Sequence, residues 1–339
     1  MRRGILSAGT WCVDLNKTIE AWPQEDTASR ILALERQGGG SGTNMATAIK
    51  RLDPEMPVEA MGLIGEDDDG RHLLALCDAM GIDRAQLRAS SAGPTFFSDC
   101  FNAKASGKRT HFYHPGIGDI LAPEHFDFAH SRARYVHLGL PGVHKAMDGP
   151  HGAHSTGWAY VLEAARKAGL KTNLEMVTAE RERVAAIGRS CLPHLDCLIV
   201  NDFEIGALAG IETRRDGRAY GPAVAEALQA VVKLGPLEIA VSHFPEGAIA
   251  ATRGGALFAC GSVAIPADEI AGVNGAGDSF AAGTLYGLHE GWEPARCIAL
   301  GHASAAMSMR EAPTTTGIRP VRQCLEAAAR WGYRPSPIS

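Results

Sequence analysis

The sequence contains no run of about 18 apolar residues, so it offers no candidate for a transmembrane helix. Its eight cysteines are scattered and form no C-x-x-C pair, which argues against a disulfide framework and favours the reducing cytoplasm. The net charge of −5 gives no general attraction to nucleic acid or to an anionic membrane. We therefore expect a cytoplasmic protein that has neither nucleic acid nor a membrane as its partner.

Two common nucleotide-binding fingerprints are also missing. Residues 37–46 read QGGGSGTNMA, but no Gly-Lys-Ser/Thr follows as in a P-loop, and no G-x-G-x-x-G follows a clear strand. We expect a glycine-rich loop that opens onto a helix over residues 46–52. Glycines let backbone N–H groups approach a ligand closely, and the amide of Asn44 can bond ligand hydroxyls.

The second half of the 339-residue chain alternates strand and helix patterns. This alternation predicts an α/β fold of one domain over residues 1–339, with a central, mostly parallel sheet and helices on both faces. Expected strands cover residues 5–8, 135–140, 170–174, 196–200 and 237–242, and expected helices cover 158–168, 203–209 and 224–234. Such sheets bind ligands beyond the carboxyl ends of their strands, so sites are expected after Leu140, Leu174, Val200 and Ser242.

The first third of the chain shows short alternating stretches instead. Residues of about 10–35 and 95–116 predict a small β-lid on the main domain, with a hairpin turn at 104–108 (KASGK). A plain surface hairpin is the alternative. Exposed strand edges on a lid favour pairing with a second copy, so we expect a homodimer through the lid.

A second glycine-rich stretch, GVNGAGDSFAAGT, covers residues 272–284. The helical pattern that follows places Gly275, Ala276 and Gly277 in a turn at a helix N-terminus, where free N–H groups and the helix dipole favour an anion. The position of Asp278 then allows two interpretations. The residue is either a capping residue, or a carboxylate beside an anion hole that accepts a hydroxyl proton during phosphoryl transfer.

These motifs together resemble those of the ribokinase-like PfkB family of carbohydrate and nucleoside kinases. Residues 275–280 (GAGDSF) resemble its C-terminal GAGD signature, and residues 39–46 (GGSGTNMA) resemble its N-terminal GG-x-G-x-N-x-A signature. Residues 62–70 resemble the strand-to-helix passage that follows, and residues 201–204 (NDFE) resemble the N-x-x-E motif. The four motifs occur in family order at family-like separations, so the resemblance covers nearly the whole chain.

The resemblance implies a Rossmann-like ribokinase fold with a β-lid, and transfer of the γ-phosphate of ATP to a hydroxymethyl group of a carbohydrate. It implies that Asp278 is the general base and that the backbone of Gly275, Ala276 and Gly277 is the anion hole. It also implies that Asn201 and Glu204 organise Mg²⁺ and its waters, with Glu204 acting through water. This fits the preference of Mg²⁺ for oxygen ligands.

On the acceptor side, the expected contacts are those that the resemblance places near the sugar, together with residues at the site edge. Asp14 matches an early acidic residue that binds sugar hydroxyls, and Glu175 and Asn173 follow a strand at the edge of the site. Phe101 is a candidate platform on the lid. The full set of expected substrate contacts is Asp14, Gly39, Gly40, Asn44, Phe101 and Glu175.

Two departures from the family pattern concern the nucleotide side. The family usually carries Asp-Thr shortly before GAGD, where the carboxylate helps to hold a monovalent cation, but this sequence has Gly272-Val273-Asn274, which leaves a K⁺ requirement open. The adenine-side turn is usually Thr-x-Gly-x-x-Gly-like, but residues 242–247 read SHFPEG. We expect nucleotide contacts from Ser242, Phe244 and Gly247, with Phe244 reshaping the pocket or lying in the core.

Alternatives remain at this point. A nucleoside or pseudouridine kinase would need an aromatic platform for the base, for which Phe101, Phe112 and Tyr113 are candidates. A non-catalytic sugar-binding protein on the same fold is disfavoured, because binding alone needs no base. Arg109, His111 and His114 either touch substrate or belong to a solvated hairpin. The His111/His114 and His151/His154 pairs have metal-like spacing without an evident third ligand.

Overall fold

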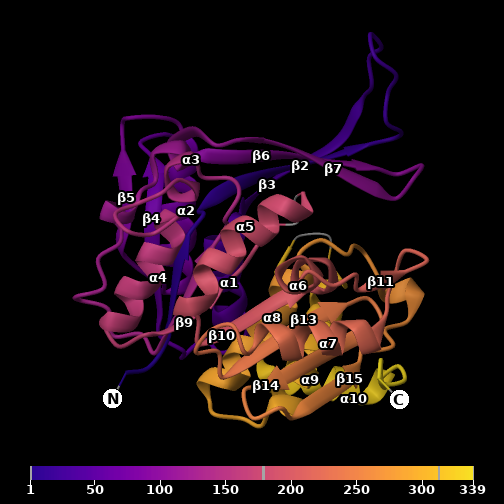
Figure 1. The fold of residues 1–339 in the computed structure, drawn as a ribbon. Helices are drawn as coiled ribbons and strands as arrows, with labels where there is room; N and C mark the ends of the chain where they lie inside the picture. Colours follow the sequence, from indigo (N-terminus) through magenta and orange to yellow (C-terminus); the bar gives the residue numbers. More distant parts are fainter. Residues whose placement is uncertain (1, 178–179, 312–313, 339) are drawn as a thin grey trace.

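The computed structural model describes residues 2–177, 180–311 and 314–338, which form two neighbouring sheets between layers of helices and a third sheet that projects from them (Figure 1). The first sheet has the strand order β5-β4-β1-β8-β9 and is parallel throughout. Its strands are β1 Ile5–Gly9, β4 Val58–Gly65, β5 Asp83–Ser90, β8 Tyr135–Gly139 and β9 Lys171–Leu174.

The second sheet has the order β10-β13-β14-β15. Its strands are β10 Cys197–Asn201, β13 Ile239–Phe244, β14 Gly247–Thr252 and β15 Leu257–Gly261. The β10–β13 pair is parallel, whereas β13, β14 and β15 are joined by antiparallel pairing. A two-stranded hairpin, β11 Arg214–Arg215 with β12 Arg218–Ala219, lies outside both sheets and was not expected from the sequence.

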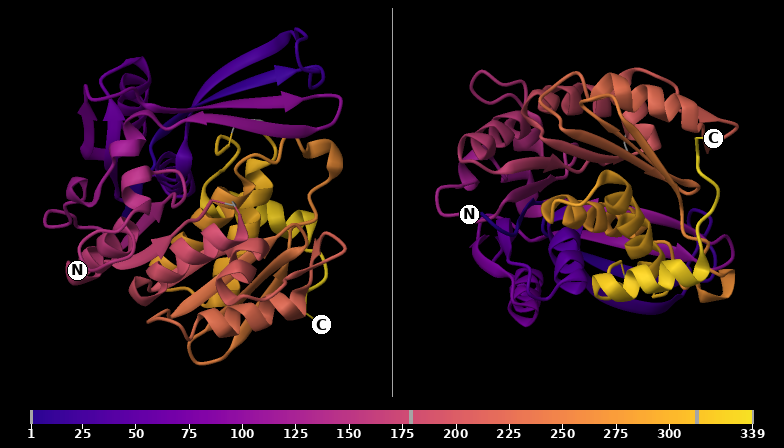
Figure 2. Two further views of the ribbon diagram at one scale, coloured as in Figure 1. Left: turned by 45° about the horizontal axis from the view of Figure 1, so that its top comes forward. Right: turned by 90° about the horizontal axis from the view of Figure 1, so that it is seen from below.

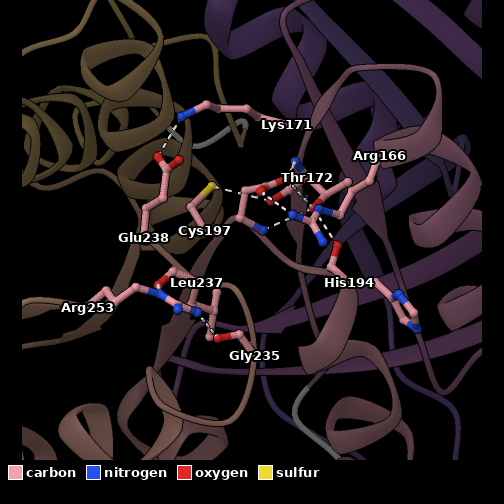
Figure 3. Close-up of polar contacts among 10 residues, drawn as sticks. Arg166, Lys171, Thr172, His194, Cys197, Gly235, Leu237, Glu238 and Arg253 are labelled. Carbon is pink, nitrogen blue, oxygen red and sulfur yellow. Dashed lines mark hydrogen bonds and ion pairs between the residues drawn. The ribbon is translucent and has the colours of Figure 1, made fainter.

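Strands β9 and β10 lie side by side where the two sheets meet, and polar side chains join them. Asp196 Oδ2 accepts hydrogen bonds from Thr172 N at 2.9 Å and from Thr172 Oγ1 at 3.0 Å, and Arg166 forms an ion pair with Asp196 at 3.2 Å. Nearer the surface, Lys171 meets Glu238 at 2.5 Å (Figure 3). We call this junction the seam. It carries the central layer from one sheet to the next.

Helices cover both faces of this central layer, as the alternating pattern predicts. One apolar cluster packs α4, α5, α6 and α7 against it, and a second cluster packs α1, α2, α8, α9 and α10 against the other face. The helices are α1 Gly40–Leu52, α2 Asp68–Met80, α3 Lys145–Asp148, α4 Gly157–Lys167, α5 Arg181–Cys191, α6 Asp202–Ala209, α7 Gly221–Val231, α8 Ala276–His289, α9 Pro294–Ser308 and α10 Val321–Trp331. Short 3₁₀ turns occupy Gly116–Ile120, Pro123–His125, Leu192–His194 and Ala267–Glu269. Among the described residues, no helix has the length and apolar character needed to cross a membrane.

The third sheet forms the predicted lid. Its order is β3-β2-β6-β7, with β2 Cys12–Ile19, β3 Ile31–Gly39, β6 Phe96–Ala103 and β7 Lys108–His114. It extends from the first sheet and overhangs the half of the molecule that contains α8 (Figures 1 and 2). The turn between β6 and β7 lies at the expected residues 104–107.

The two faces of the lid sheet carry different sets of side chains. Register places Asp14 opposite Ser98, and Cys100 opposite His111, so these residues share one face. The opposite face carries Phe101 and Leu34, both paired with Lys17. We call the first the inner face, because it is the one directed at α8, and the second the outer face.

One helix begins earlier than the sequence suggests. We expect a loop before a helix over residues 46–52, but α1 already starts at Gly40. Gly38 and Gly39 therefore end β3, and only Gly40 and Gly42 belong to the first turn of the helix. Close contacts explain them, because a Cβ atom on Gly42 would lie 2.8 Å from the carbonyl oxygen of Thr10.

Candidate active site

The N-terminus of α8 presents free backbone donors. Gly275 precedes the helix with φ +70°, a left-handed conformation that suits glycine, and a Cβ atom there would lie 2.0 Å from Cγ2 of Thr314. Among the described side chains, none caps this end of the helix. The N–H groups of the first turn, together with the helix dipole, therefore form a place for an anion at Gly275, Ala276 and Gly277.

Asp278 lies in the first turn of α8 and is held by the other half of the molecule. Nδ2 of Asn44, on α1, donates a hydrogen bond of 2.7 Å to Oδ2 of Asp278. Burial and the neighbouring charge of Glu175 raise the pKa of Asp278 to about 7, although the bond from Asn44 acts to lower it. A carboxyl group with a pKa near neutrality can accept a proton and release it again at physiological pH.

Glu175 lies just beyond β9, close enough to Asp278 for each carboxyl group to influence the pKa of the other. Burial raises the pKa of Glu175 to about 7. Its Oε2 atom lies 2.9 Å from Nε2 of His137, a fully buried residue of β8. The acceptor side thus contains a carboxyl pair.

A chain of buried hydrogen bonds fixes the orientation of His137. Asn173 Nδ2 lies 2.8 Å from His137 Nδ1, and the Cys197 thiol points at Oδ1 of Asn173 from 3.7 Å. With the amide in this orientation, His137 Nδ1 accepts and His137 Nε2–H donates to Glu175. Burial lowers the pKa of His137 to about 4, so the ring stays neutral. Asn173, which the sequence suggests as a substrate contact, therefore supports His137 from behind the site.

Asp14 reaches the same region from the inner face of the lid. Its carboxylate lies against Gly39, where a Cβ atom would come 2.3 Å from the carboxylate carbon. Burial, followed by the charge of Asp278, raises the pKa of Asp14 to about 6, whereas Arg109 acts to lower it. Gly40 has φ +76° and passes close to Thr10. Both glycines thus make room for the packing around Asp14.

A cavity of about 510 Å³ opens on the other side of the α8 N-terminus. This volume lies within the range of small-ligand sites. Its wall combines backbone from the anion hole with aromatic rings from β13, α8 and α9. Its lining includes Asn201, His243, Phe244, Gly277, Phe280 and His302.

Asn201 and Glu204 form a reciprocal cap at the start of α6. Asn201 Oδ1 accepts a hydrogen bond from Glu204 N at 2.9 Å, and Glu204 Oε2 accepts one from Asn201 N at 3.0 Å. The charge of Glu204 also acts to raise the pKa of Glu175. Among the described residues, no cluster of three His, Cys, Asp or Glu side chains could hold a metal. Amide and carboxylate oxygens here fit a Mg²⁺ ion that arrives with a nucleotide and keeps its waters.

Comparison with known proteins decides the family. The family model described as "pfkB family carbohydrate kinase" matches residues 3–320. The chain belongs to this family. It is 24% identical to the ATP-dependent ribose-1-phosphate kinase of Halopiger xanaduensis, over 93% of this chain and 96% of that protein. It is 23% identical to the 5-dehydro-2-deoxygluconokinase of Shouchella clausii, over 89% and 88%.

Solved structures share the fold of this pfkB-family chain. The ribokinase of Arabidopsis thaliana, complexed with ribose and ATP, superposes with a TM-score of 0.75 at 20% identity, covering 97% of this chain and 99% of that one. The nucleoside kinase of Burkholderia thailandensis, complexed with inosine, gives 0.73 at 18% identity, covering 98% and 100%. These likenesses confirm the predicted α/β ribokinase fold.

The structure of this family member does not bring every predicted contact to the site. Phe101 points to the outer face of the lid, where its ring packs against Trp22 at 5.8 Å and Phe112 at 6.0 Å. Asp14 lies on the opposite face, so a direct contact between Phe101 and a substrate at Asp14 does not fit this arrangement. His111 and His114 likewise alternate to opposite faces and cannot ligate one ion together.

Only some of the predicted nucleotide contacts lie at the cavity. Phe244 lines the cavity, whereas Ser242 and Gly247 are not among its lining residues. Ser242 is fully buried in β13. Gly247 starts β14, and a Cβ atom there would lie 2.6 Å from the carbonyl oxygen of Cys260, so packing within the sheet accounts for this glycine.

Three histidines at the site were not predicted as site residues. His137 supports Glu175, and His243 lies beside the anion hole, because a Cβ atom on Gly277 would be 3.3 Å from its Cε1. His302 lines the cavity, and its buried Nε2 has no hydrogen-bond partner among the described residues. The sequence gives little signal for His302, a single histidine in a helix rich in small residues.

Proposed function

We propose that this chain transfers the γ-phosphoryl group of ATP to a hydroxymethyl group of a sugar, with Asp278 as the general base. The observation that carries the proposal is the position of Asp278. Its partly buried carboxyl lies between acceptor-side groups, Asn44 and Glu175, and a cavity that begins at Gly277. A base and an anion site that share one helix end are what phosphoryl transfer requires.

On the acceptor side, Asn44 occupies Oδ2 of Asp278 and thereby orients the carboxylate. The acceptor hydroxyl donates its proton to the Asp278 carboxylate as the oxygen attacks the phosphorus atom. Asp14 and Glu175 accept hydrogen bonds from the other sugar hydroxyls, and Gly39 and Gly40 leave room for the ring. Holding the reacting hydroxyl in place supplies a large part of the rate enhancement.

On the nucleotide side, the N–H groups of the α8 turn stabilise the negative charge that spreads over the transferred group. Asn201 and Glu204 would hold the waters of a bound Mg²⁺, which would neutralise phosphate charge. The cavity lined by Phe244 and Phe280 would receive the base of ATP, and the unpartnered Nε2 of His302 would be available to it for a hydrogen bond.

The test is Asp278→Asn in a coupled assay of ADP release with Mg-ATP, across pentoses, hexoses, sugar phosphates and nucleosides. We expect turnover to fall by about 10²- to 10⁴-fold, because the amide cannot accept the proton. Asp68→Asn is the matched control, since Asp68 also lies in the first turn of a helix but is exposed. Near-normal turnover of Asp278→Asn would contradict the mechanism.

We also propose that two copies associate through the outer face of the lid. Trp22, Leu34, Phe101 and Phe112 form an apolar patch there, which we call the outer lid patch, and Leu34 is 62% exposed. Exposed apolar patches of this kind mark interaction surfaces.

A further inference from the structure

The inner face of the lid carries a cation above the acceptor side. Arg109 lies on β7 opposite Asn102, two residues before His111, whose Nδ1 atom is 3.0 Å from the Cys100 thiol. Alternation along β7 therefore places Arg109 on the inner face, with Asp14. Its neighbour Lys108 pairs with Ala103 and points to the outer face.

Arg109 is not neutralised by a direct partner. Among the described residues, no carboxylate oxygen lies within 4 Å of its guanidinium, although other arginines form such pairs, as Arg214 does with Asp202, and Lys17 meets Asp99 on the outer face of the same lid. The charge of Arg109 nevertheless acts on both Asp14 and Asp278. The guanidinium thus faces the acceptor region without being bound to it.

A neutral sugar gives no reason for such a cation, because its hydroxyls are matched by Asp14, Glu175 and Asn44. Three carboxyl groups, Asp14, Glu175 and Asp278, would moreover repel an anionic substrate unless a positive charge compensated them. Arginine suits this task, since its planar guanidinium binds a phosphate or a carboxylate through two parallel hydrogen bonds.

We propose that the acceptor carries an anionic group, a phosphate or a carboxylate, and that Arg109 binds this group. The inference rests on the proposed function and narrows its substrate class from sugars in general to anionic sugars. Arg109 is then a specificity-determining residue: it binds the end of the acceptor remote from the reacting hydroxyl, and Asp278 activates that hydroxyl.

The experiment compares acceptors that differ by the anionic group and keep a free hydroxymethyl group. Ribose is paired with ribose 1-phosphate, fructose with fructose 1-phosphate, and glucose with gluconate, so that the arms separate phosphate from carboxylate. The variants are Arg109→Gln and, as a matched control with the side chain on the other face, Lys108→Gln. Binding of each acceptor is also measured by calorimetry in the Asp278→Asn protein.

We expect the wild-type protein to prefer one anionic acceptor over its neutral counterpart. Arg109→Gln should lower kcat/KM for that acceptor by 10- to 100-fold, mainly through KM, and should change the neutral one by less than about 3-fold. Lys108→Gln should leave both unchanged. Equal losses for both acceptors would instead assign Arg109 to the transferred phosphoryl group and overturn the proposal.

Calorimetry keeps this inference separate from the proposed function. If no acceptor is turned over, the kinase proposal fails, but an anionic acceptor that binds, and that binds at least 10-fold more weakly when Arg109→Gln is combined with Asp278→Asn, still supports the role of Arg109. If ADP is released with neutral sugars, and no anionic acceptor binds, the kinase proposal stands and the inference is wrong.

Discussion

The carboxyl groups of Asp278 and Glu175 lie together in a partly buried site, where burial raises the pKa of both and the charge of Glu175 raises that of Asp278 further. Neither residue would behave this way in isolation, because a carboxyl in water is fully ionised at pH 7. His137 donates to Glu175 from behind and Asn44 donates to Asp278 from the side. The titration of the base is therefore a property of the whole cluster.

Glu175→Gln is expected to shift the acid limb of the pH profile of kcat/KM. Asp278 must be deprotonated to accept a proton, so activity rises with pH through its pKa, which is about 7 in the wild-type protein. Removing the neighbouring charge lowers this pKa, so the midpoint moves to lower pH. Glu182→Gln, an exposed change on α5, is the control.

The position of the limb, rather than the absolute rate, is the measurement that decides this prediction, because Glu175 also contacts the acceptor. An unchanged midpoint in Glu175→Gln would show that another group governs the acid limb. A midpoint displaced to higher pH would mean that Glu175 stabilises the ionised form of Asp278.

At this scale, the sequence predicts some residues and misses others for identifiable reasons. Asp278 and Asn44 stand in recognisable motifs, and the structure brings them within 2.7 Å. Glu175 follows a strand that ends at the site. Phe101 was expected as a substrate contact but lies on the outer face, because alternation shows which residues share a face but not which face is inward. His137 was missed because a histidine within an apolar strand resembles a core residue. The catalytic and binding roles stay predictions.

At the scale of the elements, the seam between β9 and β10 joins the two sheets of the central layer. Glu175 follows β9 directly and Asn201 is the last residue of β10, so both lie at the carboxyl ends of these two strands. Backbone pairing here is limited, and Asp196 supplies much of the connection through Thr172 and Arg166. The contact between the two strands therefore depends on side chains.

Asp196→Ala is expected to lower the free energy of unfolding by about 2–3 kcal/mol, because it leaves the Thr172 N–H without its acceptor and breaks a partly buried charged contact. Denaturation in urea measures this change. Glu238→Ala removes the exposed ion pair with Lys171 at the same seam and should cost less than about 1 kcal/mol. Equal effects of the two changes would contradict the role assigned to Asp196.

Most elements were predictable because their signals are local. Strands β8, β9 and β10 and helices α4 and α6 match the expected ranges closely, whereas α3 and α5 were not expected. The start of α1 and the β11–β12 hairpin were not, since glycines and short polar runs have no strong preference of their own. Tertiary contacts decide these segments, as the close approach of Gly42 to Thr10 illustrates.

At the scale of the whole molecule, the lid is unusual for a surface sheet. Such a sheet commonly packs its apolar side on the core and exposes its polar side to solvent. The inner face of the lid carries Asp14 and Arg109, whereas the outer lid patch exposes apolar rings to solvent. A monomer gains nothing from this polarity, but a pair of lids packed outer face to outer face would bury the patch. The single domain over residues 1–339 and the homodimer stay predictions.

Sedimentation at micromolar concentration is expected to show a dimer for the wild-type protein. Leu34→Lys places a charge in the outer lid patch, on the edge strand β3, and should weaken association by at least 10-fold. Leu257→Lys, which changes an exposed leucine on β15, should not. A wild-type monomer at this concentration would count against the dimer.

The bond between Asn44 and Asp278 has a consequence for exchanging parts between relatives. Asp278 belongs to a helix of the second half of the chain. Asn44, which donates the hydrogen bond, belongs to a helix of the first half, more than two hundred residues earlier. A chimaera that joined the first half of this protein to the second half of a relative would inherit a base without the partner that was shaped for it. Swaps should therefore be designed to carry α1 and α8 together, as a single inherited unit.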